Sequence, residues 1–179
     1  MNYKYYKFQN STDEVYYKVS YPSPEGFCNY LALNTLKNKV FEIKEYDNEG
    51  TEDATRFFNE NCDRIDKKTF DSIEENFLEG NSRTDVYNKY HELIKNRFDI
   101  RLKCRKKYPL DMDYLGAFMF DKDLQENGWF DLYRQASDLY SSIKNDYILK
   151  DIFDEAREVV VKKYLIDINE WKNSLQKSH

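Results

Sequence analysis

Glycine and proline are scarce in this chain, and their scarcity limits the folds that it can adopt. The 179 residues include 5 Gly and 3 Pro, where average usage gives about 12 and about 9 in a chain of this length. Tight turns are therefore few, and no low-complexity linker separates independent parts. Long helices are the elements that best use such a composition.

Large aromatic side chains supply the material for a core. The chain has 16 Tyr, 12 Phe and 2 Trp, and 40% of its residues are apolar. A chain of this length buries roughly 70% of the surface that its unfolded form exposes, so it needs neither disulfides nor a metal for stability. The sequence therefore predicts a folded globule, although 34% of its residues are charged.

The first 50 residues are typical of β structure. Four short runs are rich in Tyr, Phe and Val, which favour strands, at residues 3–8, 15–21, 27–33 and 40–46. Clusters of turn-forming residues separate these runs, at residues 10–13, 22–26 and 36–39. We predict a meander of three or four antiparallel strands.

Helical spacing of apolar residues begins after Thr51. Asp66 predicts the start of one helix, because its carboxylate can accept the N–H groups of a first turn. Thr84 predicts the cap of the next helix, which should stop near Lys107 because Pro109 disfavours helical geometry at the residue before it.

The rest of the chain carries further helical segments. Asp111 opens an apolar segment, and we predict a buried helix over residues 114–120 that Gly128 breaks. Another helix follows over residues 129–140. Apolar residues then recur between 148 and 175, either in one helix or in a helix with a separate terminal one.

These patterns together predict an α+β fold. A small N-terminal antiparallel β-meander is expected to pack on a mainly helical bundle of about five to six helices. Residues 1–50 form the predicted β-meander subdomain and residues 51–179 the helical subdomain, within one compact unit.

The cysteines and the absence of apolar stretches indicate a cellular location. Cys28, Cys62 and Cys104 are odd in number and form no CxxC pair, which is typical of reduced thiols in a reducing compartment. The N-terminus lacks the apolar stretch of a signal peptide, and no apolar run approaches the roughly 20 residues that cross a bilayer. We therefore expect a cytoplasmic protein without a membrane partner.

Sequence signatures of catalysis and of cofactor binding are absent. Five scattered glycines cannot build a phosphate-binding loop, and three dispersed cysteines with two histidines cannot build a zinc site. His91 could act as a general base, but a surface histidine of a helix is the more frequent role. We therefore predict no cofactor, no metal ion and no enzymatic activity.

Two carboxylate pairs are the remaining catalytic candidates. Asp111 with Asp113, and Asp121 with Asp123, could hold a hard cation through oxygen ligands. They define one alternative function, a carboxylate- or metal-dependent hydrolase. Helix capping by Asp111 and plain exposure of the others is the more frequent role for such residues.

Charge is unevenly distributed along this chain of net charge −5. Residues 42–63 contain eight acids and two bases, and residues 95–107 contain seven bases and one acid. The acidic segment, with half-exposed Tyr anchors, predicts a surface that binds another protein through Glu42, Glu45, Asp47, Glu49, Glu52 and Asp53. The basic segment offers the alternative of a nucleic-acid partner, which the overall acidity disfavours, bound through Arg97, Arg101, Lys103, Arg105, Lys106 and Lys107.

Residues 127–133 read Asn-Gly-Trp-Phe-Asp-Leu-Tyr. They resemble the start of a helix in a family of bacterial DNA-mimic and uncharacterised helical proteins, which carries an Asn-Gly-Gly-Phe motif followed by Gln and aromatic residues. Trp129 and Leu132 depart from that motif, and four positions match it, Asn127, Gly128, Phe130 and Tyr133. The resemblance implies an all-helical partner-binding protein, which the β-like N-terminus contradicts, so we assign no family.

The abundance of Tyr, Lys and Asn without a catalytic signature looks like the small proteins of bacteria or their phages. Immunity proteins and counter-defence inhibitors are common among them. The leading prediction is therefore a non-enzymatic protein-binding module, such as an immunity or phage-type inhibitor protein that occludes a partner.

Overall fold

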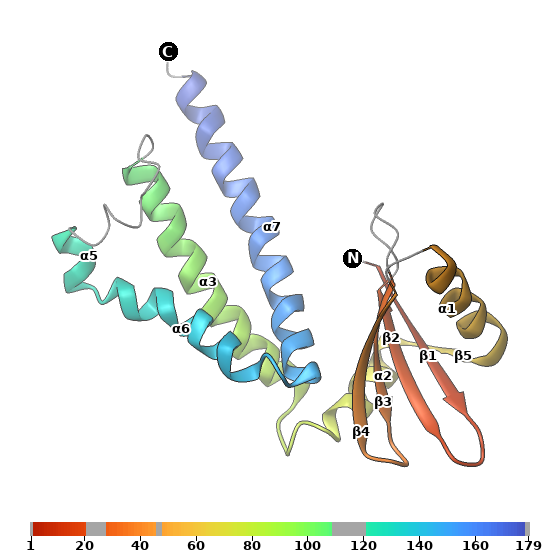
Figure 1. Ribbon diagram of the computed structural model, residues 1–179. Helices are drawn as coiled ribbons and strands as arrows, with labels where there is room; N and C mark the ends of the chain where they lie inside the picture. The colour runs from red at the N-terminus through yellow and green to blue at the C-terminus, as the bar shows by residue number, and fades with distance from the viewer. Residues whose placement is uncertain (1, 21–27, 46–47, 109–120, 178–179) are drawn as a thin grey trace. The chain divides into compact units, whose positions relative to one another are not determined.

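The chain forms two compact units, Met1–Arg83 and Thr84–His179 (Figure 1). The computed structural model describes residues 2–20, 28–45, 48–108 and 121–177. Within these ranges an antiparallel sheet lies in the first unit, and the chain has six helices. The predicted α+β class is therefore confirmed.

Five antiparallel strands form the sheet of the first unit. Their order across the sheet is β4-β3-β2-β1-β5, with β1 (Tyr3–Gln9), β2 (Glu14–Ser20), β3 (Cys28–Asn34), β4 (Lys39–Glu45) and β5 (Asp63–Ile65). Strands β1 to β4 confirm the predicted meander. The short β5 is a fifth strand beside β1 that the sequence pattern did not predict. Register places Tyr6 opposite Tyr17 and Tyr17 opposite Ala32, so these side chains share one face of the sheet.

Helix α1 (Asn48–Asn61) covers that face of the sheet. Phe58 is 1% exposed, and its ring lies 5.1 Å from those of Tyr6 and Tyr17 and 5.3 Å from that of Tyr30. Such edge-to-face and offset contacts add to the area that the rings bury. The predicted subdomain boundary at residue 50 therefore lies inside a helix that is packed on the sheet.

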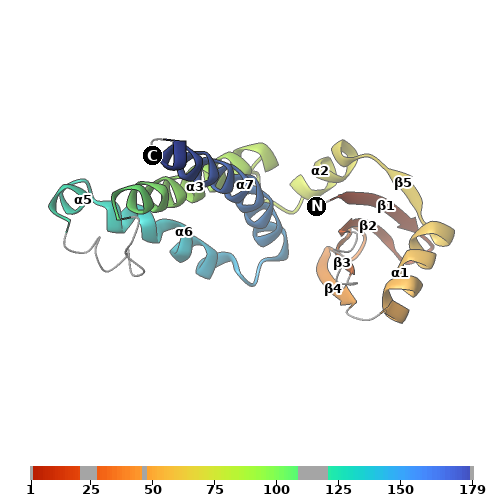
Figure 2. The ribbon, with the colours of Figure 1, turned by 90° about the horizontal axis from the view of Figure 1, so that it is seen from above.

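Helix α2 (Lys67–Glu75) packs on the opposite face of the sheet. Phe70, which is 1% exposed, lies 5.4 Å from the ring of Tyr5, and Tyr5 points away from the face that α1 covers. The view from above shows α1 and α2 on different sides of the strands (Figure 2). The predicted helix start is confirmed, because the Thr69 N–H donates to Asp66 Oδ1 at 2.7 Å.

A buried ion pair lies at the end of the first unit. Arg83 Nε is 2.6 Å from Glu74 Oε2 and 3.4 Å from Asp71 Oδ1, and the Arg83 backbone N–H donates to Glu75 Oε1 at 3.1 Å. The Glu74 side chain is fully buried, and that of Arg83 is 9% exposed. Burial makes such a pair sensitive to the loss of either partner.

Four helices of the second unit lie within the described residues: α3 (Arg83–Lys107), α5 (Lys122–Glu126), α6 (Trp129–Ile143) and α7 (Tyr147–Lys177). Ring pairs connect α3 to α7, Tyr90 with Phe153 at 5.9 Å and Phe98 with Tyr164 at 5.2 Å. The second pair lies further along the chain than the first on both helices, so α3 and α7 run in the same direction. Tyr140 of α6 joins them, 5.4 Å from Phe153.

The ends of these helices follow the sequence except at the start of α3. This helix begins at Arg83, so Thr84 lies within its first turn and the predicted cap at Thr84 is wrong. Helix α3 ends at Lys107, as predicted. Gly128 precedes α6 with φ 63°, a left-handed conformation that glycine adopts at no steric cost. Helix α7 is a single helix of 31 residues, so the second terminal helix is not formed. The predicted helix over residues 114–120 lies outside the described residues.

Two observations bear on the predicted cellular environment. The three cysteines are free, with Cys28 and Cys104 buried and Cys62 half-buried. Burial raises the pKa of Cys62 to about 11 and that of Cys104 to about 12, which keeps both thiols protonated and unreactive at neutral pH. The described helices include none with the length and apolar character that a membrane crossing requires.

Candidate functional site

The described residues of the predicted acidic surface lie on strand β4 and on helix α1. Glu42 and Glu45 belong to β4; three residues apart in a strand, they point to opposite faces of the sheet. Asp47 lies outside the described residues. Glu49 and Asp53, together with Glu52, lie on α1 and are exposed.

One side of α1 carries a set of carboxylates, which we call the acidic face: Glu49, Glu52, Asp53 and Glu60, all exposed. At 100° per residue these four positions span about 100° of the helix. Phe58 is buried on the other side, so the helix is fixed by its apolar side and presents its charged side to solvent. Arg56 lies within the acidic face and pairs with Asp53.

The predicted basic residues occupy two sides of α3. Arg97, Arg101 and Arg105 recur every four residues and therefore share one side. A second side carries the lysines, Lys103, Lys106 and Lys107. Lys107 forms an ion pair with Asp121. The six residues therefore do not form the single phosphate-binding stripe that the nucleic-acid alternative assumed.

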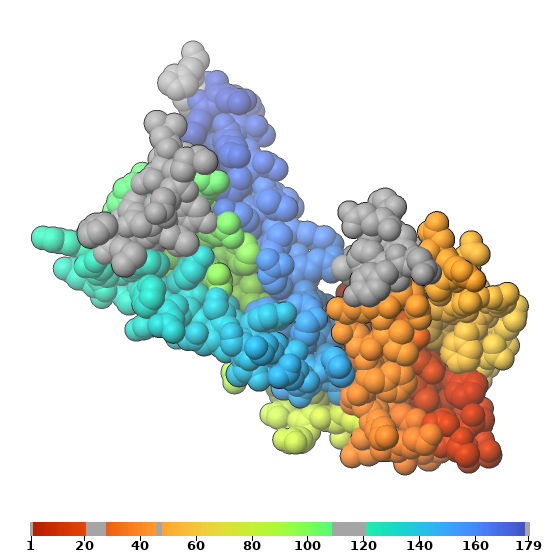
Figure 3. Space-filling model, viewed as in Figure 1, coloured from red at the N-terminus to blue at the C-terminus, as the bar shows by residue number. Residues whose placement is uncertain are grey.

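A cleft of about 430 Å³ gathers arginines from two helices, and we call it the arginine cleft. Buried side chains of Ile94, Ala136 and Phe153 give it an apolar part. Figure 3 shows the surface of α3 (green) between α6 (cyan) and α7 (blue). The polar lining of the cleft comes from all three of these helices and consists of Arg97, Arg101, Ser137, Ser141, Asp154 and Arg157.

Aromatic rings hold two of these guanidinium groups in place. Arg97 lies 4.4 Å from the ring of Tyr133, and its guanidinium donates to Ser137 Oγ and, at 3.4 Å, to the Tyr133 hydroxyl. Arg101 lies 5.9 Å from the ring of Phe98 and 5.8 Å from that of Tyr164. Such cation–π contacts restrict the side chains before any ligand arrives.

The charge of the arginine cleft is strongly positive. Arg157 of α7 is exposed and adds a third guanidinium to those of Arg97 and Arg101. Asp154 is the carboxylate of the described lining, and it pairs with Lys150 at 3.0 Å. Arginine stays charged at every physiological pH, so the cleft attracts anions under all such conditions.

Sequence reasoning missed four members of the polar lining of the cleft, Ser137, Ser141, Asp154 and Arg157. It placed Arg97 and Arg101 in a basic segment but assigned no role to α6 or α7. Arg157 lies between apolar residues of the α7 stripe, where an exposed arginine is common. Only the packing of α7 beside α3 brings Arg157 to the other two arginines.

A second cavity, of about 440 Å³, lies between α3 and α7. Its lining includes Leu102, Val160 and Tyr164, together with His91. Two ion pairs within single helices border it, Lys95 with Asp99 and Lys163 with Asp167. Its charged side chains are thus paired locally, and His91 stacks on Tyr87 at 6.0 Å.

The hydrolase alternative depended on four aspartates, of which Asp111 and Asp113 lie outside the described residues. Asp121 is buried and caps α5, accepting from the Leu124 N–H at 3.2 Å and from the Tyr108 hydroxyl at 2.6 Å. Its expected exposure is therefore wrong. Hydrogen bonds from Lys107 and Tyr108 lower the pKa of Asp121 to about 2. Within the described ranges no group of three or more His, Cys, Asp or Glu has the arrangement of a metal site.

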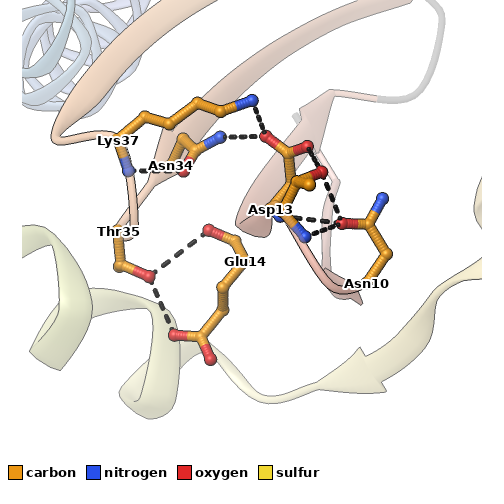
Figure 4. Close-up of polar contacts among 7 residues, drawn as sticks. Asn10, Asp13, Glu14, Asn34, Thr35 and Lys37 are labelled. Atoms are coloured by element: carbon orange, nitrogen blue, oxygen red, sulfur yellow. Dashed lines mark hydrogen bonds and ion pairs between the residues drawn. The ribbon is translucent and has the colours of Figure 1, made fainter.

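A polar network connects the two loops at one end of the sheet (Figure 4). Asp13 Oδ1 accepts from Asn34 Nδ2 at 2.8 Å and from Lys37 Nζ at 2.5 Å. Asn10 Oδ1 accepts from the Asp13 N–H at 2.7 Å, and Thr35 Oγ1 donates to Glu14 Oε1 at 2.8 Å. Every charge in this set has a partner within it, so the network fixes the β1–β2 and β3–β4 loops rather than binding a ligand.

This network predicts a pH dependence of stability. Hydrogen bonds from Lys37, Thr12 and Asn34 lower the pKa of Asp13 to about 2, from about 3.9 in an unfolded chain. A lowered pKa contributes stability that is present above about pH 4 and is lost as the pH falls toward about 2. We expect Asp13→Asn to unfold at lower urea concentration than the wild type at pH 5, with a difference that shrinks toward pH 2. Glu60→Gln, at an exposed carboxylate of α1, is the control, and a constant difference for Asp13→Asn would contradict the assigned network.

Comparisons with protein-family models, curated proteins and solved structures gave no match for this chain. Its function is therefore argued from its own geometry. Among the described residues, the acidic face of α1 and the arginine cleft both carry concentrated charge.

Proposed function

We propose that the protein is a non-enzymatic binding module that contacts a basic surface of another protein through the acidic face of α1. The observation that carries the proposal is the presence of four exposed carboxylates on one side of a helix whose other side is fixed to the sheet by Phe58. A fixed helix presents its charges with little further ordering on binding. Concentrated negative charge accelerates the encounter with a positively charged partner.

The proposal includes a mode of action and a place. The protein acts in the cytoplasm by occluding the functional surface of its partner, as an immunity or phage-type inhibitor protein does. Occlusion requires complementary charge and shape but no reacting group. This mode of action therefore agrees with the first unit, where Asp13 and Glu14 are engaged in the hydrogen-bond network of the β1–β2 and β3–β4 loops.

Reversing the charge of the acidic face tests the proposal. The triple variant Glu49→Lys, Glu52→Lys, Glu60→Lys changes three exposed carboxylates and leaves the Asp53–Arg56 pair in place. Partners are captured on the immobilised wild type from a nuclease-treated lysate of the source organism and identified by mass spectrometry. Association of the captured protein with the triple variant should be at least about ten-fold slower at low salt and should lose its salt dependence.

A matched variant separates the acidic face from net charge. Glu92→Lys, Glu126→Lys, Glu170→Lys makes the same change in net charge at three exposed positions of the second unit. It should associate at nearly the wild-type rate. Equal rates for both triple variants would reject the acidic face as the contact, and a lysate component that is lost on nuclease treatment would favour the nucleic-acid alternative.

A further inference from the structure

The arginine cleft has the chemistry of a binding site for a specific class of anion. Guanidinium groups reach it from two helices, Arg97 and Arg101 from α3 and Arg157 from α7, and hydroxyl groups reach it from α6. Donors on three helices can form hydrogen bonds with a bound group from several directions. A ligand with a single acceptor atom would not use all of these donors.

We propose that the arginine cleft binds the phosphate group of a ligand. Guanidinium groups form charge-assisted, paired hydrogen bonds with phosphate oxygens. Three guanidinium groups offer charge for a dianion, while Asp154 is already paired with Lys150. A carboxylate has one negative charge and two oxygens in a plane, so it would leave part of this donor set unused.

Ser137 strengthens the case for an oxyanion. Its Oγ accepts a hydrogen bond from Arg97, so its own hydroxyl hydrogen can be donated to a ligand oxygen. Arg97 is at the same time stacked 4.4 Å from the ring of Tyr133. The Arg97–Ser137 pair is therefore oriented before binding, which reduces the entropy lost on complex formation.

The size and the apolar part of the cleft indicate that the phosphate belongs to a larger molecule. A volume of about 430 Å³ falls in the range of small-molecule sites and exceeds what a phosphate ion fills. Phe153 and the exposed Tyr140 line the same cleft and can contact an apolar or planar body. The ligand class is thus a phosphate ester, either a free nucleotide-like molecule or a segment of a nucleic-acid strand.

This inference is independent of the proposed function. It concerns the second unit, whereas the acidic face belongs to the first. Loss of the carboxylates on α1 would leave the arginine cleft unchanged, and loss of Arg157 would leave the acidic face unchanged. Failure of one proposal therefore says nothing against the other.

Titration of the full chain with three probes tests the inference. Inorganic phosphate, adenosine 5′-monophosphate and a single-stranded oligonucleotide of about 20 nucleotides are added at constant ionic strength, with chloride as the reference anion. The Nε–Hε resonances of Arg97, Arg101 and Arg157 are followed by NMR. Saturable shifts of these resonances that chloride does not produce are expected with phosphate and with the monophosphate.

Two single variants, both on α7, provide the decisive comparison. Arg157→Gln should weaken binding about ten-fold or more, because it removes a charge-assisted donor. Lys172→Gln makes the same change in charge at an exposed position outside the cleft and should change the affinity less than about two-fold. Arg157→Lys, which keeps the charge but loses the fork of donors, should give an intermediate affinity.

The outcomes distinguish the source of the phosphate and can overturn the inference. Tighter binding of the monophosphate than of inorganic phosphate identifies a small phosphate ester. Tighter binding of the oligonucleotide, weakening steeply with salt, identifies a nucleic-acid strand. Resonances that respond no more to phosphate than to chloride, or equal weakening by Arg157→Gln and Lys172→Gln, would overturn it.

Discussion

Replacing Phe58 with alanine is expected to lower the free energy of unfolding of the first unit by about 3–5 kcal/mol, the usual loss for a large aromatic side chain removed from a core. Phe58 is 1% exposed and contacts the rings of Tyr6, Tyr17, Tyr30 and Phe57. Removing its ring leaves a cavity between α1 and the sheet. The loss should be measured by urea unfolding followed by far-UV circular dichroism and tyrosine emission.

The chain supplies both a control and a separate optical signal for this experiment. Leu36→Ala, at a side chain that is 60% exposed, should change stability by no more than about 0.5 kcal/mol. Trp129 and Trp171 both belong to the second unit, so tryptophan emission follows that unit alone. A loss smaller than about 1 kcal/mol for Phe58→Ala would contradict the packing of α1 on the sheet.

The second large effect is expected at the buried ion pair. Replacing Arg83 with methionine should cost about 3–5 kcal/mol, because it leaves the carboxylate of Glu74 buried without its guanidinium. The Glu74 side chain has no exposed surface, and its Oε2 lies 2.6 Å from Arg83 Nε. Urea unfolding at pH 7, followed by tyrosine emission, measures the loss.

A double variant separates the buried charge from lost packing. Arg83→Met combined with Glu74→Leu should recover much of the stability lost in Arg83→Met alone, because the pair is then replaced by apolar side chains. Arg134→Met breaks an exposed pair with Asp138 and should cost at most about 1 kcal/mol. A double variant as unstable as the sum of both single variants would show that the two residues act independently.

Local signals in the sequence were sufficient for most of the elements. Short runs rich in Tyr, Phe and Val predicted strands β1 to β4, because each of these strands has side chains packed in the core beneath α1. Asp66 marked the start of α2, since its carboxylate accepts a first-turn N–H whatever lies elsewhere. Gly128 marked the break before α6, because a glycine adopts its φ of 63° without steric strain.

Features that depend on a distant partner could not be predicted in this way. Strand β5 is a run of three residues without apolar periodicity, and it is a strand because Ile65 and Arg64 pair with β1. Asp121 carried no local sign of burial, since its partners are distant in the sequence. They are Lys107, the last residue of α3, and Tyr108, which follows that helix. The arginine cleft likewise needs three helices, and only two of its three arginines lay in a segment with visible charge bias.

The position of β4 at the edge of the sheet bears on how the protein stays dispersed. Within the described residues β4 pairs with β3 alone, and a strand with an open side is a template on which other chains can polymerise into fibrils. Apolar residues of β4, such as Phe41 and Ile43, would favour that reaction. Glu42 and Lys44 alternate with them, and Lys39 and Glu45 stand at the two ends of the strand. We expect Glu42 and Glu45, which the sequence predicts as partner contacts, to act also as gatekeepers against aggregation of the sheet that holds the acidic face in place.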